Sequence, residues 1–259
     1  MKRKREIILL GILILLMFVI NYSFVDNAVV EFLDDYETTI VERVIDGDTI
    51  VVGNDTHVRL LGINTPEKGE KYYNEAKNFL SMVILNKTVE LRFGKERYDR
   101  YGRELAYVFY NDANVNLELV DEGYANFYFP SGKDEYYDRA VKNWEHCISN
   151  NKYLCEKSDD KCADCVELEE FENQEVIFGN NCNFECDLTG WSIKDEGRKK
   201  FIFGDFVLEK NKEVKIIVGN KTNSNGILYW KNEDYVWTET GDTLFLRDKG
   251  GKLVLWKKY

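Results

Sequence analysis

The sequence predicts an α+β domain followed by an all-β domain. In the first half, short β-rich runs alternate with segments whose apolar residues recur at helical spacing. From Val166 onward, short strands are separated by turns and no helical pattern is present. The two halves are joined by a polar, cysteine-rich stretch at residues 150–165. A chain of 259 residues is long enough to hold two small domains of this kind.

Five strands and three helices are predicted in the first half. Asp46-Gly47-Asp48 lies between two β-rich runs and marks a hairpin. Asn74–Leu85 carries apolar residues at positions 76, 79, 80, 83 and 84, which is the spacing of one helix face. Gly123 ends the second helix. The predicted strands are Thr39–Val44, Thr49–Val52, His57–Ile63, Lys87–Phe93 and Glu104–Tyr110, and the predicted helices are Asn74–Leu85, Val115–Glu122 and Glu135–Ile148.

The second half reads as a β-sandwich, because its strands are short, regular and without intervening helices. Trp191 is expected to fill the core of this domain rather than to bind a ligand. The polar positions of this half hold no set of acids and bases that converge on one place. The predicted strands are Val166–Phe171, Gln174–Gly179, Gly190–Lys194, Lys200–Phe203, Val214–Gly219, Val236–Thr238, Thr243–Arg247 and Leu253–Trp256.

The N-terminal residues have the pattern of an export signal. Lys2-Arg3-Lys4-Arg5 precedes an uncharged run from Ile7 to Val25, which reaches nearly across a bilayer core of about 30 Å. No small-x-small cleavage site follows the run, so we expect an uncleaved signal anchor at residues 1–25 with the basic end inside the cell. A cleaved secretory signal is the alternative. Both place the rest of the chain outside the cytoplasm, beyond a short acidic spacer at residues 26–37.

The six cysteines lie close together in the sequence, at the end of the first domain and the start of the second. In an exported protein they are expected to form disulfides. We expect one bridge between Cys147 and Cys155, and bridges from Cys162 and Cys165 to Cys182 and Cys186, with the partners of the last four left open. The rival interpretation is a zinc site, because Cys-x2-Cys followed by Cys-x3-Cys has ribbon-like spacing.

Three short segments supply the residue types needed to cut a phosphodiester with a hard divalent cation. Asp48 and the Asn64-Thr65 corner offer oxygen ligands suited to Ca²⁺. Two arginines, at positions 59 and 103, offer planar donor groups that match phosphate oxygens. A glutamate at position 67 is placed to orient or deprotonate a water molecule. Each residue by itself has a structural explanation, such as a turn carboxylate or a solvated loop.

Taken together, these segments resemble the staphylococcal nuclease (thermonuclease) family over roughly Thr38 to Lys157. The resemblance extends to the segments Gly102–Val108 and Val115–Ala125, which occur in the same order. It implies a five-stranded barrel of the oligonucleotide/oligosaccharide-binding type with three helices. It also implies that DNA and RNA, preferably single-stranded, are hydrolysed to products with 3′-phosphate ends.

The resemblance assigns a role to each candidate residue. It implies that Asp48, Asn64 and the Thr65 carbonyl bind Ca²⁺; that Arg59, Glu67 and Arg103 are catalytic; and that Arg100, Tyr101 and Tyr128 bind the substrate. Asn64 departs from the family pattern, because it stands where well-studied members have an aspartate. An amide oxygen can bind Ca²⁺, but the site then has one negative charge fewer, and ligand charge tunes calcium affinity.

The second half resembles the lamin tail domain, an immunoglobulin-like sandwich. The resemblance rests on Asp187–Trp191, Leu228–Trp230 and Gly241–Asp248, which are packing and turn motifs. The sequence therefore predicts a signal anchor or signal peptide at 1–25, a spacer at 26–37, a nuclease-like domain at 38–157, a cysteine-containing junction at 158–165 and a lamin-tail-like sandwich at 166–259.

The net charge of −11 is unusual for a protein that acts on nucleic acid. It disfavours a non-specific binder, which depends on neutralising phosphates, but a nuclease needs only a local basic cleft. We therefore predict an extracytoplasmic nuclease whose C-terminal domain docks a partner. The alternative is a non-catalytic nucleic-acid-binding or adhesion protein that uses the barrel and the sandwich as binding platforms.

Overall fold

The computed structural model describes residues 36–238 and 241–258. The predicted anchor and most of the predicted spacer lie outside these residues. In the described part of the chain, none of the helices has both the length and the apolarity needed to cross a membrane. Residues from Thr38 onward form one compact unit that contains both predicted domains.

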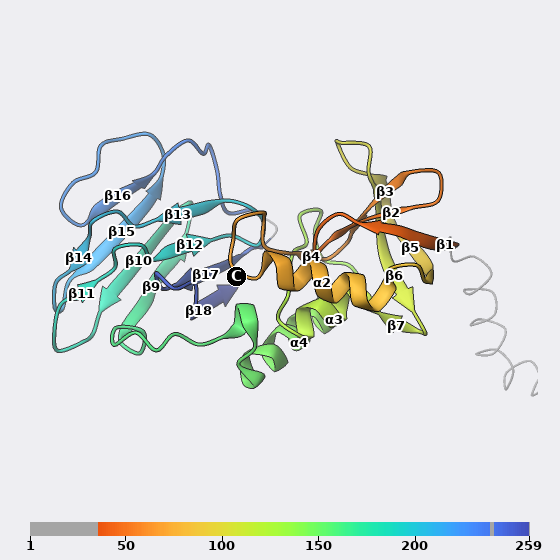
Figure 1. The fold of residues 1–259 in the computed structure, drawn as a ribbon. Helices are drawn as coiled ribbons and strands as arrows, with labels where there is room; N and C mark the ends of the chain where they lie inside the picture. Colours follow the sequence, from red (N-terminus) through yellow and green to blue (C-terminus); the bar gives the residue numbers. More distant parts are fainter. Residues whose placement is uncertain (1–35, 239–240, 259) are drawn as a thin grey trace, which may run out of the picture. The chain divides into compact units, whose positions relative to one another are not determined.

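The first domain is a closed five-stranded barrel, as predicted (Figure 1). Its strands follow the order β3-β2-β1-β5-β6, and a parallel pairing of β3 with β6 closes it. Two short strands, β4 and β8, pair beside the barrel and carry Asn64 opposite Asn126. The bounds are β1 (Tyr36–Val44), β2 (Thr49–Val52), β3 (Thr56–Leu60), β4 (Ile63–Asn64), β5 (Thr88–Tyr98), β6 (Glu104–Tyr110), β7 (Ala113–Asn114) and β8 (Asn126–Phe127).

The predicted strand His57–Ile63 is wrong in one respect, because the structure breaks it into β3 and β4. Gly62 lies between them with a φ of 72°, a conformation that disfavours residues with a side chain. A Cβ at Gly62 would also come within 2.7 Å of the Tyr107 hydroxyl. The break turns the chain sharply, so that Asn64 and Thr65 leave the direction of β3. In contrast to this split, β5 continues well past the predicted end at Phe93.

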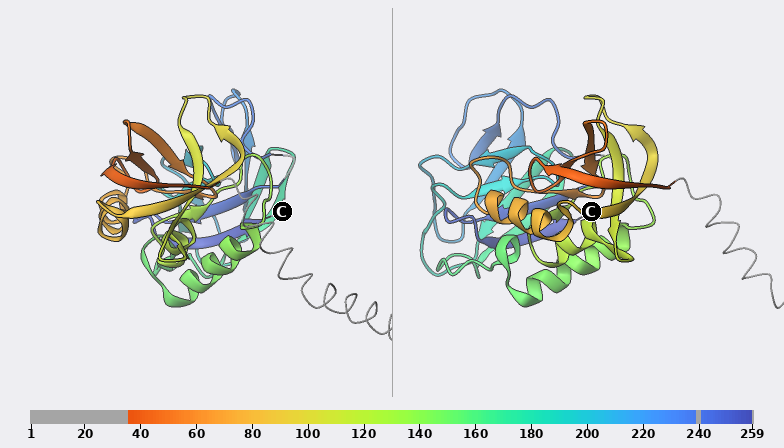
Figure 2. Two further views of the ribbon diagram at one scale, coloured as in Figure 1. Left: turned by 90° about the vertical axis from the view of Figure 1, so that its right-hand side faces the viewer. Right: turned by 45° about the vertical axis from the view of Figure 1, so that its right-hand side comes forward.

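The three predicted helices are confirmed as α2 (Tyr73–Ile84), α3 (Val115–Asp121) and α4 (Tyr137–Asn150), with a short 3-10 helix η1 (Tyr153–Cys155) after them. Ala76, Leu80 and Ile84 form the buried face of α2. The helix α3 begins at Asn114, whose side chain accepts a hydrogen bond from the Leu117 amide. Helices α3 and α4 lie side by side in both views of Figure 2.

The second domain is a β-sandwich, as predicted. Two four-stranded sheets have the orders β16-β15-β10-β9 and β13-β12-β17-β18, and β11 pairs with β14 beside them. Trp191 is fully buried in the core between them, as expected. The bounds are β9 (Val166–Glu172), β10 (Glu175–Asn180), β11 (Cys186–Asp187), β12 (Ser192–Lys194), β13 (Lys200–Ile202), β14 (Val207–Leu208), β15 (Glu213–Val218), β16 (Ile227–Trp230), β17 (Thr243–Arg247) and β18 (Leu253–Lys258).

One predicted strand of the sandwich does not form. At Val236–Thr238 the backbone is irregular, and the amides of Val236 and Trp237 donate to the side-chain oxygen of Gln174 instead of to a neighbouring strand. The sheet edge is occupied by Ile227–Trp230, which pairs in parallel with β15 and which the sequence prediction missed. The alternation of Leu228 and Trp230, both buried, is the signal for this strand.

All six cysteines are paired in disulfides. Cys147–Cys155 joins the end of α4 to η1, as predicted, and the four remaining cysteines pair as Cys162–Cys186 and Cys165–Cys182. The sulfurs of Cys162, Cys182 and Cys186 lie within 4.8 Å of one another because the two bridges pack together. With every described cysteine bonded to another, no thiolate remains for the zinc site that the spacing also allowed.

The two domains share part of one hydrophobic core. Phe245 and Leu253 of the second domain are buried in the cluster of the first. The Phe245 ring packs edge-on against Trp144, with 5.2 Å between ring centroids, and against Phe127. Aromatic contacts of this kind contribute roughly 0.5–1.5 kcal/mol beyond area burial. The position of the second domain is therefore fixed by core packing as well as by the linker.

Three buried acids lie next to this shared core. Asp195 and Glu196 are in the turn between β12 and β13, and Asp242 lies beside it. Glu196 accepts hydrogen bonds from the Thr243 hydroxyl at 2.7 Å and from the Phe129 amide at 3.2 Å. Burial raises the pKa of Glu196 to about 7. The hydrogen bond from Thr243 opposes this shift, and the nearby charge of Asp242 adds to it. Burial and Asp242 likewise raise the pKa of Asp195 to about 7.

These pKa shifts predict that the protein loses stability as the pH rises from about 4.5 to about 7. In that window the folded state keeps a proton on Glu196 that the unfolded state releases, so the free energy of unfolding falls with pH. In Glu196→Gln, the free energy of unfolding should fall less over this pH range. The difference from wild type should be on the order of 2–3 kcal/mol, since each pKa unit corresponds to about 1.4 kcal/mol. Urea unfolding at pH 5 and pH 8 measures the difference.

The matched control is Glu209→Gln, because Glu209 is exposed on the same domain. It should leave the pH dependence unchanged. An identical fall in stability for wild type and Glu196→Gln would show that this carboxyl titrates normally in the folded protein.

Candidate active site

The turn between β1 and β2 brings two carboxylates together. Asp48 is almost fully buried, and its Oδ2 accepts hydrogen bonds from the Thr65 amide at 3.0 Å and the Thr65 hydroxyl at 2.9 Å. The Asp46 carboxylate accepts a hydrogen bond from the Asp48 amide at 3.1 Å. Burial and the neighbouring Asp48 raise the pKa of Asp46. Sequence reasoning gave Asp46 no role of its own, although it belongs to the same Asp-Gly-Asp turn.

Gly47 explains how this turn reaches Thr65. A Cβ at Gly47 would lie 2.8 Å from the Cβ of Ala76 and 2.9 Å from the Cβ of Thr65. Carbon atoms that are not bonded to each other do not come this close. Only glycine at position 47 therefore lets the turn pack against α2 and the Thr65 corner. This close packing of the turn allows Asp48 to accept a hydrogen bond from the Thr65 amide.

Arg59 projects from β3 toward the same turn. Its Nη2 lies 3.1 Å from Asp48 Oδ2 and donates to the Ile63 carbonyl at 3.0 Å, while its Nη1 donates to the Leu60 carbonyl at 2.6 Å. These contacts come from the segment on both sides of the Gly62 break, so the break builds the pocket for the guanidinium. Arg59 is only 7% exposed, and a buried guanidinium paired with a carboxylate keeps a fixed orientation.

Asn64 and Thr65, on and just after β4, are also buried. The Asn64 Oδ1 faces Arg59 Nη2 at 3.4 Å, and its Nδ2 donates to the Gly197 carbonyl of the second domain at 2.8 Å. Oxygen donors from Asp46, Asp48, Asn64 and Thr65 therefore occupy neighbouring positions. A set made only of oxygens fits a hard cation such as Ca²⁺ better than a softer metal.

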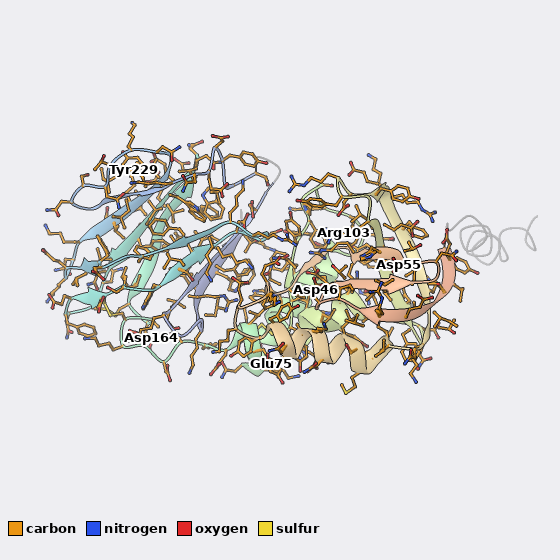
Figure 3. All side chains as sticks on the ribbon, turned by 45° about the horizontal axis from the view of Figure 1, so that its top comes forward. Asp46, Asp55, Glu75, Arg103, Asp164 and Tyr229 are labelled. Carbon is orange, nitrogen blue, oxygen red and sulfur yellow. A yellow bond between two sulfur atoms is a disulfide. The ribbon has the colours of Figure 1, made fainter. Side chains whose placement is uncertain are left out.

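Arg103 reaches the site from the loop before β6. Its guanidinium is ion-paired with Asp99 at 2.7 Å, and its Nη1 lies 3.5 Å from the Thr49 hydroxyl. Figure 3 labels Arg103 and Asp46, which both belong to the first domain. The Thr49 hydroxyl in turn donates to Asp48 Oδ1 at 3.2 Å. The structure thus brings Asp48, Arg59 and Arg103 around one turn, although they come from three separate segments.

Glu67 lies at the edge of this group. It follows Pro66 directly, and its side chain is 46% exposed. Its Oε1 is ion-paired at 2.7 Å with Nε of Arg198, which lies in the β12–β13 turn of the second domain. Arg198 was not predicted to belong to the site, because no local motif marks it and only the packing of the two domains brings it there.

The predicted substrate-binding residues fall into two places. Tyr101 is exposed, its hydroxyl accepts a hydrogen bond from Arg100 at 2.7 Å, and the Arg103 guanidinium lies 5.6 Å from its ring centroid. Tyr128 follows β8 in the first domain and lies next to the second domain. A Cβ added at Gly197 of the second domain would be 3.3 Å from the Tyr128 ring. Burial and Asp195 raise the pKa of Tyr128, while Arg59 and Arg198 oppose the shift.

The turn of the second domain is bound to the barrel by buried hydrogen bonds. Besides Asn64 to Gly197, the Asn126 Nδ2 donates to the Glu196 carbonyl at 2.9 Å. Asn64 and Asn126 are opposite each other on β4 and β8, so one two-stranded unit carries both donors. The second domain consequently touches the candidate active site through a fixed backbone contact.

Comparisons with known proteins agree with this geometry. The staphylococcal nuclease homologue family model matches residues 57–153, and the lamin tail domain model matches residues 165–259. The thermonuclease of Staphylococcus hyicus is 40% identical over 126 residues, which cover 44% of this chain and 75% of that protein. An uncharacterized endonuclease of Haemophilus influenzae is 40% identical over 111 residues, covering 41% of this chain and 61% of that protein.

The thermonuclease of Staphylococcus intermedius is 40% identical over 109 residues, covering 39% of this chain. The chain spans just under two thirds of that relative, 65% of its length. Both predicted resemblances are therefore confirmed, and they occur in the predicted order. The chain belongs to the staphylococcal nuclease family, and a lamin tail domain follows its nuclease domain.

Proposed function

We propose that this protein is a calcium-dependent nuclease that hydrolyses phosphodiester bonds of DNA and RNA. The observation that carries the proposal is the convergence of Asp48, Arg59 and Arg103 on the β1–β2 turn. A buried carboxylate, two guanidinium groups and neighbouring oxygen donors are the components that phosphate chemistry requires. The names of the relatives, thermonuclease and endonuclease, support the same activity.

Asp48, the Asn64 amide oxygen and the Thr65 carbonyl would hold the ion, with Asp46 as a further carboxylate nearby. When bound there, Ca²⁺ would neutralise part of the negative charge of the phosphate. Arg59 is held by carbonyl groups and by Asp48, which fix the orientation of its guanidinium beside the proposed ion site. Arg103 is tied to Asp99 by a partly exposed ion pair and can reorient toward the phosphate.

Glu67 is proposed to orient or deprotonate the attacking water. Its carboxylate lies half-exposed at the rim, where a water molecule has access. The ion pair with Arg198 holds the carboxylate, and exposed pairs of this type are weak, typically under about 1 kcal/mol. Substrate binding can therefore release Glu67 at small cost.

Arg100, Tyr101 and Tyr128 are proposed to bind the nucleotides next to the cleaved bond. Tyr101 and Arg100 form an exposed aromatic and basic surface, which suits the stacking of unpaired bases. This favours single-stranded substrates, and family resemblance implies 3′-phosphate products. The predicted docking of a partner by the second domain stays a proposal, and its contacts with Asn64, Glu67 and Asn126 favour a role in the nuclease itself.

The site predicts activity that depends on added calcium. Purified protein should degrade plasmid and RNA in millimolar Ca²⁺ at alkaline pH, and a chelator should abolish the degradation, because the phosphate charge would lose its counter-charge. Gel electrophoresis measures the loss of intact substrate, and end-labelling reports the position of the phosphate. Intact plasmid and RNA after prolonged incubation with Ca²⁺ would contradict the enzyme function.

The geometry also predicts that Arg103→Ala lowers turnover by roughly 10²–10³, since it removes one donor that stabilises transition-state charge. The melting temperature should change little because the side chain is partly exposed and its partners, Asp99, Thr49 and Tyr101, lie near the surface turn before β6 and at the start of β2. Arg139→Ala, which removes an equal charge from an exposed position on α4, is the matched control and should keep full activity. Near-normal turnover combined with a large loss of stability would make Arg103 a structural residue.

We propose that the enzyme acts outside the cytoplasm. The three disulfides support this, because such bridges persist in oxidising compartments. Protease added to intact cells should digest the domains from residue 38 onward, and full-length protein should be found in the membrane fraction. A mature N-terminus after residue 20 would mean that the protein is secreted, whereas protection from protease until the cells are lysed would place it in the cytoplasm.

A further inference from the structure

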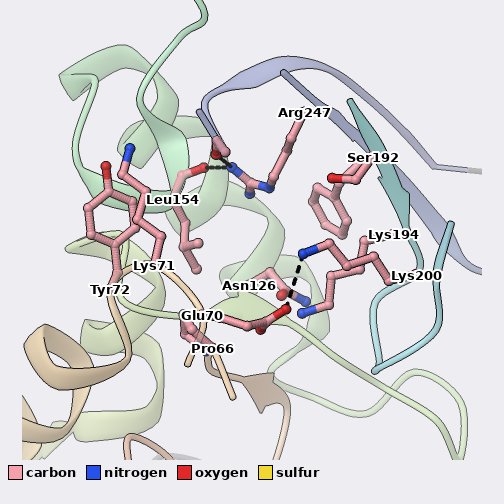
Figure 4. A pocket seen from close by; sticks show the side chains of 12 residues that line it. Pro66, Glu70, Lys71, Tyr72, Asn126, Leu154, Ser192, Lys194, Lys200 and Arg247 are labelled. Carbon is pink, nitrogen blue, oxygen red and sulfur yellow. Dashed lines mark hydrogen bonds and ion pairs between the residues drawn. The ribbon is translucent and has the colours of Figure 1, made fainter. Parts of the chain in front are cut away.

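A cavity of about 70 Å³ with mixed apolar and charged lining lies where the first domain meets β12, β13 and β17 (Figure 4). The first domain contributes Leu154, Asn126 and four residues of the segment Pro66–Tyr72. One water molecule needs roughly 10–15 Å³, so the cavity has room for a group of several atoms but not for a nucleoside. Its charged lining residues facing the centre are Glu70, Lys194, Lys200 and Arg247.

The charges of this cavity do not balance. Glu70 is the one carboxylate that lines it, and its Oε1 lies 3.3 Å from the Lys200 ammonium. Arg247 uses its Nη1 to donate to the carbonyls of Leu154 at 2.6 Å and Gly251 at 3.1 Å, which orient the guanidinium without neutralising it. Lys194 is the third cation. Three basic side chains thus face a single carboxylate.

Two carboxylates lie just outside the cavity, where Asp195 attracts Lys194 and Asp248 attracts Arg247. Asp195 accepts the Lys199 amide in the β12–β13 turn, and burial raises its pKa, which reduces its charge near neutral pH. Asp248 accepts the Ser158 hydroxyl and the amides of Gly250 and Lys252. A further lining lysine, Lys71, is ion-paired with Glu156 and is not part of the excess.

The environment of Lys194 agrees with an unbalanced site. Burial lowers the pKa of Lys194, and the attraction of Glu70 only partly offsets this, while Arg247 and Lys200 repel the same ammonium. The pKa of Glu70 is lowered against its own burial, chiefly by Lys194 and Lys200. A charge taken out of water is costly unless an opposite charge meets it. An anion in the cavity would supply that charge.

We propose that this cavity is a binding site for a phosphate group, formed by Lys194, Lys200 and Arg247 of the second domain and closed by the Pro66–Tyr72 segment of the first. A phosphate carries between one and two negative charges at neutral pH and would face the basic side chains of Lys194, Lys200 and Arg247. Its oxygens accept several hydrogen bonds at once, and Ser192 adds a hydroxyl to the lining.

The cavity is next to the candidate active centre in the chain, because Glu67 lies between two residues that line the cavity. Pro66 lines the cavity and precedes Glu67, and Glu70 accepts a hydrogen bond from the Glu67 amide at 3.0 Å. Two sources of phosphate fit the cavity: inorganic phosphate and the terminal phosphate of a nucleic-acid strand. The second source rests on the proposed nuclease function, and the first does not.

The test is phosphate binding to the full chain, measured by isothermal titration in detergent with a chelator present. Lys194→Met keeps the length of the side chain and removes its charge, and it should weaken binding of inorganic phosphate at least tenfold. Lys200→Met should act in the same direction and covers the case in which the first variant fails to fold. Lys210→Met, at an exposed position of the same domain, is the control and should bind as wild type does.

Arg103→Ala separates this cavity from the active centre, and it should leave the phosphate site intact. Loss of binding in Arg103→Ala together with unchanged binding in Lys194→Met would assign all phosphate binding to the active centre and overturn the proposal. So would the absence of saturable binding up to about 10 mM phosphate. Nuclease activity is assayed separately, so an inactive protein that still binds phosphate through Lys194 would refute the proposed function alone.

Single-stranded DNA oligonucleotides decide the source. If the terminal phosphate of a strand is the ligand, an oligonucleotide with a phosphorylated 3′ or 5′ end should bind more tightly than the same strand with hydroxyl ends, and Lys194→Met should abolish the difference. Equal binding of all three strands, with Lys194-dependent binding of inorganic phosphate, would identify the free ion as the ligand.

Discussion

The buried carboxylate of Asp48 is the interaction on which the candidate site depends. It joins the β1–β2 turn to the Thr65 corner through two hydrogen bonds and is ion-paired with Arg59. Breaking a buried pair by removing one partner costs roughly 3–5 kcal/mol, because the other charge stays buried. The same contacts that make the turn rigid therefore place the oxygens and the guanidinium that phosphate chemistry needs. Gly47 and Gly62 make this arrangement possible, since each is a point where a side chain would collide with its neighbours.

The second domain is a structural part of this site rather than an appendage. Its β12–β13 turn accepts hydrogen bonds from Asn64 and Asn126 and ion-pairs with Glu67 through Arg198. The contact with the second domain gives a reason for an amide at position 64. The Asn64 Nδ2 donates to a carbonyl oxygen, and an ionised carboxylate at the same position would have no proton to donate. One amide side chain thus offers an oxygen to the site and a hydrogen bond to the neighbouring domain.

The junction between the domains combines apolar packing with an unusual density of charge. Phe245 supplies apolar contact with the barrel core, while Glu196, Asp195 and the cationic cavity lie beside it. Buried charge destabilises an interface unless it is paired, so a junction built only for stability would be more apolar. The β12–β13 hairpin places the buried acids Asp195 and Glu196 close to the lysines Lys194 and Lys200 at this junction.

The sequence by itself determined the two domains, most of their elements and the identity of the candidate site residues. Periodicity marks α2, alternation marks the strands, and the order of the Asp-Gly-Asp, Asn-Thr-Pro-Glu and Tyr-Gly-Arg segments marks the site, because these signals are local. Only the tertiary structure decided how the last four cysteines pair, that Val236–Thr238 bonds to a side chain instead of a sheet, and that Arg198 meets Glu67. Those outcomes depend on contacts between residues far apart in the chain. No local pattern carries that information, since packing of the two domains selects the partners.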